Sequence, residues 1–181
     1  RDLSASCAVH WRDSPTPALT LRCVVRDDVH AQPFGADPAN AAKTWRGDSL
    51  QLALHPLPPH GGQAPRWPTL VNAALTEAGP RLYRHRAHDG SAPGVLSDVE
   101  LQIQRDERSA TTTYRLTLPA ARFGLGELRH GAVVGAAVLV NDRDGAAAGR
   151  PPRREGFVRW GGGIGDSHDP GRYGWWVLGP P

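Results

Sequence analysis

Short runs of alternating hydrophobic and polar positions recur along the whole chain. In residues 48–54 the leucines Leu50, Leu52 and Leu54 fall on every second position. This period of two is typical of half-buried β-strands, whose successive side chains point to opposite faces of a sheet. We therefore predict strands over residues 19–27, 48–54, 69–76, 81–86, 99–105, 111–118, 133–140, 157–160 and 173–178, and a short helical turn over 119–125.

The residues between these runs favour turns. Glycine and proline are frequent, at 21 and 17 of 181 residues, and both disfavour helix interiors. Hairpins are expected across residues 77–80 and 106–109, and the nearly continuous apolar run 133–140 is expected at the centre of a sheet. The predicted fold is all-β, an antiparallel β-sandwich resembling a jelly roll, in a single domain over residues 1–181. The longest irregular stretches, at 28–47, 55–68 and 141–156, are expected to be loops that carry function.

The two cysteines lie on either side of a turn centred near Pro15. A hairpin around that turn pairs residues whose numbers add to about 30, which places Cys7 opposite Cys23. Facing residues of antiparallel strands bring their Cβ atoms within disulfide range, but a slip of one residue would separate the sulfur atoms. The alternatives are a disulfide, which favours an extracytoplasmic protein, and two buried thiols.

The net charge of +3 is modest, although the sequence pI is about 9.3. Arginines gather at Arg143, Arg150, Arg153, Arg154 and Arg159. They are interpreted either as solvated loop residues or as contacts for an anionic glycan. No motif of a nucleic-acid-binding fold accompanies them, so nucleic acid is not an expected partner. No apolar run is long enough for membrane insertion.

Five segments, in order, resemble the family 9 carbohydrate-binding modules and their DOMON-like relatives. Residues 45–52, Trp-Arg-Gly-Asp-Ser-Leu-Gln-Leu, are similar to the family's Trp-x-x-Asp-Ser-Val-Glu strand opening. The other segments are residues 25–30, 114–119, 138–145, and Trp160 with 169–174. The resemblance implies a β-sandwich module of a secreted bacterial glycan-active protein, located outside the cell, in the periplasm or at the cell surface. The chain begins without methionine and without the family's first strand, so we expect a module excised from a larger protein, with neighbouring domains as partners.

The resemblance also implies a polysaccharide- or oligosaccharide-binding site. Trp45 matches one tryptophan of the family's sugar clamp, Gln51 matches a sugar-contacting glutamate, and Asp48 belongs to the same motif. His168 stands where the second clamp tryptophan is found, and Leu139 replaces a glutamine of the family. Because two of four expected contacts are altered, either the ligand differs or the domain is purely structural. The alternative interpretation of Trp45 is a ring that covers the edge of the core.

The remaining tryptophans follow from strand geometry. Trp67, in a proline-rich segment, is a further candidate for ligand binding. Trp175 and Trp176 are adjacent, so on a strand they point to opposite faces. Trp11 and Trp160 are expected in the core.

An acidic turn is the candidate metal site. Asn141, Asp142 and Asp144 offer hard oxygen ligands, which calcium prefers, and family members often carry structural calcium. Asp27 and Asp28 form a second candidate. The spacing excludes an EF-hand, and the alternative is a turn whose side chains cap their own backbone.

Glycan binding without catalysis is therefore the leading functional hypothesis. The alternative is a structural β-sandwich that packs against the catalytic domain of a glycoside-processing enzyme. An enzyme is not expected, because the chain has no nucleophile elbow, HExxH motif or Cys-His signature. Haem is not expected without methionine, and the glycine run 161–165 lacks the βαβ context of a nucleotide site.

Overall fold

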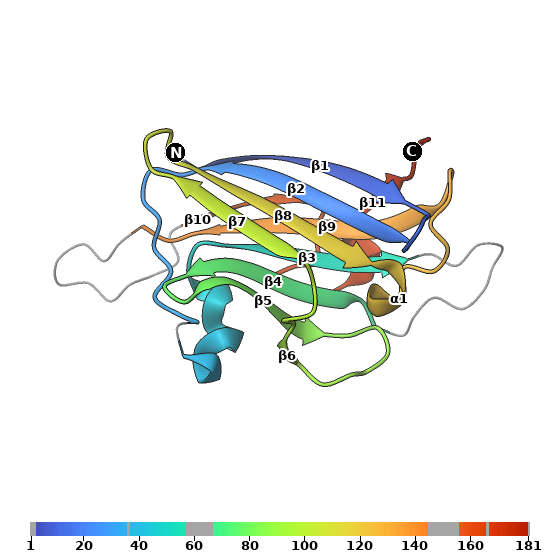
Figure 1. The fold of residues 1–181 in the computed structure, drawn as a ribbon, viewed down its shortest axis with the longest axis horizontal. Helices are drawn as coiled ribbons and strands as arrows, with labels where there is room; N and C mark the ends of the chain where they lie inside the picture. Colours follow the sequence, from blue (N-terminus) through green and yellow to red (C-terminus); the bar gives the residue numbers. More distant parts are fainter. Residues whose placement is uncertain (1–2, 36, 57–66, 145–155, 166, 181) are drawn as a thin grey trace.

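The chain folds as two antiparallel sheets packed face to face (Figure 1). The computed structural model describes residues 3–35, 37–56, 67–144, 156–165 and 167–180. This architecture confirms the predicted β-sandwich. No helix in these residues is long and apolar enough to cross a lipid bilayer.

The first sheet has four strands in the order β1-β2-β8-β7. β1 and β2 form the hairpin around Pro15, and β7 and β8 form the hairpin predicted across residues 106–109. The bounds of the strands are β1 Ser4–Arg12, β2 Ala18–Arg26, β7 Leu101–Asp106 and β8 Thr111–Pro119.

The second sheet runs in the order β10-β9-β3-β4-β5-β6, and β11 also pairs with β9. β9 pairs with β3, β10 and β11, so the continuous apolar run is central as predicted. The bounds are β3 Ser49–Pro56, β4 Thr69–Thr76, β5 Gly79–Arg86, β6 Gly94–Val95, β9 Val133–Asp142, β10 Gly156–Trp160 and β11 Gly174–Val177.

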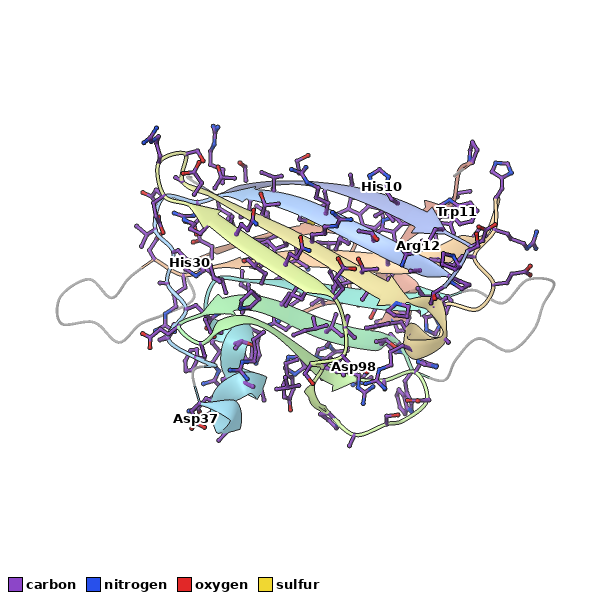
Figure 2. The ribbon with its side chains drawn as sticks, in the orientation of Figure 1. His10, Trp11, Arg12, His30, Asp37 and Asp98 are labelled. Atoms are coloured by element: carbon purple, nitrogen blue, oxygen red, sulfur yellow. A yellow bond between two sulfur atoms is a disulfide. The ribbon has the colours of Figure 1, made fainter. Side chains whose placement is uncertain are left out.

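Three short helices complete the described chain. The predicted helical turn is α1, Ala120–Phe123, and a single 3-10 turn, η3, spans Pro170–Arg172. The 3-10 helix η1, Pro38–Arg46, lies inside the stretch predicted to be irregular. Its N-cap residue is Asp37, labelled in Figure 2, whose Oδ1 accepts the N–H of Ala39 at 2.9 Å.

The core lies between the inner faces of the two sheets. Leu50, Leu52 and Leu54 share this face and are at most 1% exposed. They pack with Leu19 and Leu21 of β2 in one continuous apolar cluster. Burial of a leucine side chain contributes roughly 1.5–3 kcal/mol, so the alternation seen in the sequence supplies the main stabilisation of the sandwich.

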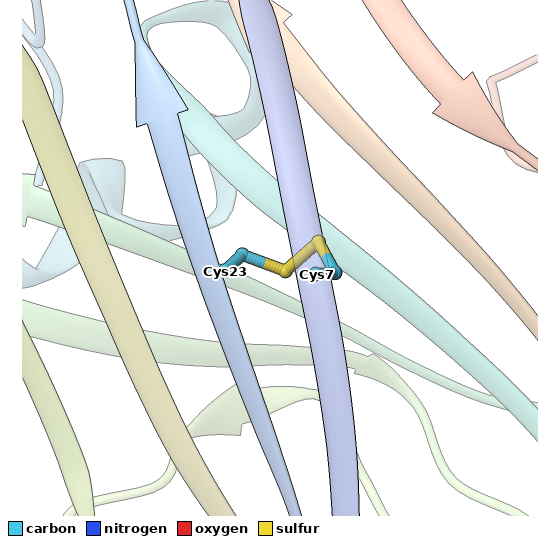
Figure 3. Close-up of a disulfide and its surroundings, with 2 residues drawn as sticks. All are labelled: Cys7 and Cys23. Carbon is cyan, nitrogen blue, oxygen red and sulfur yellow. A yellow bond between two sulfur atoms is a disulfide. The ribbon is translucent and has the colours of Figure 1, made fainter.

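The β1–β2 hairpin has the register predicted from its turn. Cys7 faces Cys23 across the two strands, and their sulfur atoms form a disulfide (Figure 3). Cys23 is fully buried in the core cluster, whereas Cys7 is exposed on the edge strand. The disulfide therefore links the edge of the first sheet to the interior.

Two tryptophans differ in their placement from the core positions expected. Trp11 is half-buried against the core, and its Nε1 donates to the Gly179 carbonyl at 2.9 Å. Trp160 is 46% exposed and stacks on Trp176 with a centroid separation of 5.8 Å. Trp160 is outside the core because β10 is the edge strand of its sheet. Trp175 is exposed and Trp176 is half-buried, in the alternating pattern predicted.

Candidate functional site

A pocket of about 320 Å³ opens beside β3, β4 and β5 of the second sheet. It is called the Trp45 pocket below. Its side chains come from the end of η1, from these three strands and from the loop before β11. The residues that line it are Trp45, Gln51, Leu70, His85, Arg86, Gly165 and His168.

The chain between η1 and β3 makes a close turn that positions Trp45. The Gly47 N–H donates to the Thr44 carbonyl at 3.2 Å and closes the helix. A Cβ atom at Gly47 would lie 2.6 Å from Oε1 of Gln32, so any larger residue there would displace the Gln32 amide. Gln32 in turn donates from Nε2 to the carbonyls of Thr44 and Asp48, each at 2.9 Å. These contacts fix the half-buried Trp45 at the mouth of the pocket.

Gln51 places its amide in the wall of the pocket. It lies on the face of β3 opposite the core leucines, beside Asn72 of β4 and Leu139 of β9. Asn72 Nδ2 donates to Thr44 Oγ1 at 2.7 Å, whereas the Gln51 side chain makes no hydrogen bond with any described residue. Its donor and acceptor therefore remain available to a ligand.

Leu139 belongs to a small apolar cluster at the pocket. It is 1% exposed and packs with Leu70, Ile164 and Tyr173. The position that carries a glutamine in the family is therefore used for packing. A polar contact from Leu139 to a ligand is excluded by its chemistry and its burial.

A β-bulge directs two consecutive residues of β5 toward the pocket. Leu70 pairs with Arg86 and Val71 pairs with Arg84, so His85 is the extra residue of the bulged strand. His85 and Arg86 both line the pocket as a result. Neither was predicted, because strict alternation would put one of them on the core side.

Burial lowers the pKa of His85, and the nearby His168 lowers it further. Nε2 of His85 is buried and has no hydrogen-bond partner among the described residues. The His85 ring meets Tyr83 edge-on at a centroid distance of 4.9 Å. The neutral imidazole is therefore favoured in the folded protein, with one nitrogen unsatisfied.

His168 reaches the pocket from a tightly closed loop. The Asp169 carboxylate accepts the Gly171 N–H at 2.8 Å and caps η3, and the Gly162 N–H donates to the Arg172 carbonyl at 2.8 Å. His168 itself has a φ of 51°, a left-handed conformation that is uncommon for residues other than glycine. The loop thus holds an exposed imidazole on the same pocket as Trp45.

Each of the two predicted site tryptophans lies under an arginine. The Arg46 guanidinium carbon is 5.2 Å from the Trp45 ring centroid, and that of Arg86 is 5.4 Å from the ring of Trp67. Trp67 is 44% exposed and adjoins the pocket through Arg86. Such cation–π contacts restrict both partners and leave a ring face or edge for other groups.

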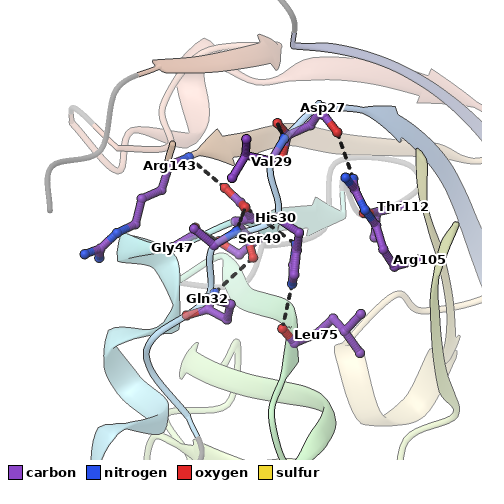
Figure 4. A network of polar contacts seen from close by, with 12 residues as sticks. Asp27, Val29, His30, Gln32, Gly47, Ser49, Leu75, Arg105, Thr112 and Arg143 are labelled. Carbon is purple, nitrogen blue, oxygen red and sulfur yellow. Dashed lines mark hydrogen bonds and ion pairs between the residues drawn. The ribbon is translucent and has the colours of Figure 1, made fainter. Parts of the chain in front are cut away.

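Three of the predicted ligand-binding residues, Trp45, Gln51 and His168, thus line one pocket. Asp48 does not join them. It is 3% exposed and lies just before β3, in contact with His30, Gln32 and Arg143, which Figure 4 labels. Its carboxylate accepts the backbone N–H groups of Ala31 and of Arg143, the latter at 2.6 Å.

Of the predicted arginine cluster, the two described members, Arg143 and Arg159, do not line the pocket. Arg143 is 4% exposed, donates from Nη1 to the Arg46 carbonyl at 3.3 Å, and lies over the Phe34 ring. Arg159 is exposed on the edge strand β10. Arg150, Arg153 and Arg154 lie outside the described residues.

The candidate metal residues are arranged differently from the prediction. Carboxylate oxygens of Asp27, Asp48 and Asp142, all buried, lie within 4.8 Å of one another; these three residues are called the acidic cluster. Asp144 meets Asp27 and Asp28 in a second group. Asn141 lies on the opposite face of β9, where its Nδ2 donates to Ser49 Oγ at 3.1 Å. Residues of the two candidate metal sites predicted from the sequence therefore meet in two groups that share Asp27, and Asn141 belongs to neither group.

The acidic cluster is chemically suited to a hard cation. The pKa of Asp48 is raised from 3.8 to about 7, mainly by burial; two backbone hydrogen bonds lower it, and the charges of Asp27 and Asp142 add to the rise. Carboxylate oxygens at this spacing are the ligands that calcium accepts. A bound divalent ion would offset the repulsion among the three carboxylates.

Comparison with known proteins supports the architecture. No protein-family model matches the chain, and a search of curated proteins found no match. A family 9 carbohydrate-binding module from Caldicellulosiruptor kristjanssonii in complex with glucose aligns with a TM-score of 0.61 at 15% identity, over 100% of this chain and 80% of that one. The fold is that of the family 9 carbohydrate-binding modules.

Two further structures agree with this assignment of the fold. The same type of module from that organism in complex with cellotriose aligns with a TM-score of 0.57 at 15% identity, over 100% of this chain and 77% of the other. A protein from Bacteroides uniformis with a suggested role in carbohydrate binding aligns at 0.55 and 13% identity, over 97% and 78% of the two chains.

Proposed function

We propose that this chain binds a glycan, without catalysis, in the Trp45 pocket. The observation that carries the proposal is the juxtaposition of Trp45, Gln51 and His168 in one open pocket. Sugar rings present apolar C–H faces to aromatic rings, while polar groups fix the hydroxyls. Comparable folds were determined with glucose and with cellotriose bound, which supports this class of ligand.

The side chains available at the pocket favour binding over hydrolysis. Glycoside hydrolysis requires a pair of carboxyl groups on either side of the scissile bond. The described residues that line the pocket include none. The three carboxylates of the acidic cluster are buried, and that of Asp48 accepts backbone N–H groups.

We infer that the protein works outside the cytoplasm as a module of a larger bacterial glycan-active protein. The disulfide between Cys7 and Cys23 supports an oxidising compartment. Such a module raises the local concentration of an attached enzyme on its polysaccharide. The acidic cluster is proposed to hold a structural calcium ion, which would stabilise the loops around β3.

A second function is favoured by a different surface. An apolar groove of about 390 Å³ lies between β1 of one sheet and β9 and β10 of the other, lined by Val9, Val140, Val158 and Trp160 among others. A structural sandwich that packs against a neighbouring domain would use such a groove. This alternative predicts no response to any sugar.

Titration calorimetry with a panel of neutral and acidic oligosaccharides tests the proposal. Trp45→Ala is expected to weaken binding about 30-fold, since truncating a central aromatic contact costs about 2 kcal/mol. Trp160→Ala, an exposed tryptophan of the apolar groove, is the matched control and is expected to bind as the wild type does. Equal affinities in the wild type and in Trp45→Ala would place the sugar elsewhere, and no binding to any sugar would favour the structural role.

A further inference from the structure

Two guanidinium groups stand beside the Trp45 pocket without acidic partners among the described residues. Arg86 lines the pocket over the Trp67 ring, and Arg46 lies over the Trp45 ring. The ion pairs formed within the described residues involve other basic groups, those of His30, Arg105, Arg122 and Arg129. Within this part of the chain Arg86 is therefore held by stacking, and its N–H donors are left for a ligand.

The acidic residue on the neighbouring loop is occupied elsewhere. Asp169 follows His168 in the sequence, but its Oδ1 accepts the Gly171 N–H and caps η3. Asp166 lies outside the described residues. Within the described part of the pocket, all ionisable side chains are basic: His85, Arg86 and His168.

The lowered pKa of His85 is consistent with a positive electrostatic potential in this pocket. The pKa of His85 is lowered by burial and by its neighbour His168, so added positive charge is disfavoured there. An anion entering the pocket would relieve this effect. Focusing of one sign of charge in a concave site attracts ligands of the opposite sign.

We propose that the Trp45 pocket selects an acidic sugar, a uronic acid whose carboxylate is bound by Arg86. This inference rests on the glycan-binding function proposed above and names its substrate class. A planar guanidinium donates two parallel hydrogen bonds to a carboxylate, a geometry that a neutral hydroxymethyl group cannot accept. In this arrangement Trp45 contacts the sugar ring, Gln51 binds the hydroxyls, and Arg86 binds the carboxylate.

The division of roles follows from where each residue lies. Arg86 is fixed in direction by the bulge of β5 and by the Trp67 ring beneath it. Gln51 lies on β3, which is separated from β5 by β4. The sugar ring therefore spans β4, with its carboxylate at the β5 side of the pocket.

Matched trisaccharides test the proposal by calorimetry at pH 7. One of each pair ends in glucose or galactose, and the other ends in the corresponding uronic acid. We expect the uronate to bind at least about tenfold more tightly than its neutral partner, as for a hydrogen-bonded charge. Raising the salt concentration should weaken the uronate selectively, because screening acts on the charge pair.

Substitutions of Arg86 test whether this residue causes the preference for uronates. In Arg86→Gln the ratio of uronate to neutral affinity is expected to fall to about one, and Arg86→Lys is expected to retain part of it. Arg122→Gln is the control, since Arg122 is an exposed arginine whose partner is Asp98 at 3.1 Å. Circular dichroism confirms that each variant is folded.

The outcomes separate the two levels of the proposal. Equal affinity for both members of each pair in the wild type would overturn the selection of acidic sugars and leave glycan binding intact. A preference that survives in Arg86→Gln would remove Arg86 from its role. Absence of binding to all four sugars would instead contradict the proposed function itself.

Discussion

The segment from Trp45 to Gln51 separates two regions of opposite charge. On one side lies the Trp45 pocket, whose described ionisable residues are all basic. On the other side lies the acidic cluster, formed where β2, β3 and β9 begin or end. A stretch of seven residues therefore contributes Trp45 and Gln51 to an open site and Asp48 to a buried one.

The two regions differ in how their polar groups are satisfied. The Asp48 carboxylate accepts two backbone N–H groups from distant loops, and its backbone carbonyl accepts from Gln32. In the pocket, the side chains of Gln51 and Arg86 make no hydrogen bond with described residues. Polar groups whose hydrogen bonds are made within the protein stabilise the fold, whereas surface polar groups without such bonds are available to a ligand. Changes in the acidic cluster should therefore alter stability, and changes in the pocket should alter affinity.

The largest expected effect is a dependence of stability on pH through Asp48. Its pKa is about 7 in the folded protein, against an ordinary value of 3.8 for an exposed aspartate, so the folded state binds the proton more tightly. The resulting stability is fully present below about pH 4 and is lost as the pH rises through 7, by up to about 4 kcal/mol. Urea unfolding in EDTA from pH 4 to 8 measures this loss.

Asp48→Asn provides the comparison for that measurement. The variant cannot ionise at this position, so its free energy of unfolding should vary less over the same pH range. The difference between the two curves isolates Asp48 from other titrating groups. Parallel curves would show that Asp48 does not carry the effect.

Calcium is expected to oppose this loss by a somewhat smaller amount. A free concentration of one hundred times Kd stabilises the folded state by about 2.7 kcal/mol, which raises Tm by roughly 5–10 °C in a domain of this size. Differential scanning calorimetry in calcium and in EDTA measures the shift. Asp142→Asn should abolish it, while Asp98→Asn, at an exposed carboxylate away from the cluster, should keep it. An unchanged Tm in excess calcium would refute the metal site.

Most of the fold could be predicted because its signal is local. Alternating leucines at 50, 52 and 54 define one face of β3, and the turn at Pro15 sets the facing of Cys7 and Cys23. The 3-10 helix η1 was missed, since its sequence has neither apolar periodicity nor length. Its start depends on capping by Asp37, whose carboxylate accepts the N–H of Ala39 and the Nδ2 of Asn40.

The site could be predicted only in part because its remaining signals are not local. Trp45 and Gln51 follow from a motif of fixed spacing in one continuous segment, from the end of η1 to the start of β3. His85 and Arg86 reach the pocket through a bulge that depends on pairing with β4. Asp48 points into the acidic cluster because two loops distant in sequence supply its donors. Such pairings are set by the tertiary fold and leave no period in the sequence.

The smallest expected effect comes from changing the charge inside the Trp45 pocket. Gln51→Glu restores the residue found in the resembling family and adds one negative charge opposite Arg86. The ratio of uronate to neutral-sugar affinity should fall about tenfold, because like charges repel the carboxylate. Gln51→Ala, the control for lost hydrogen bonding, should weaken both sugars to a similar extent and leave the ratio near that of the wild type. Calorimetry with the matched trisaccharides measures both. An unchanged ratio in Gln51→Glu would mean that a charge on β3 does not act on the bound carboxylate, and this prediction would be wrong.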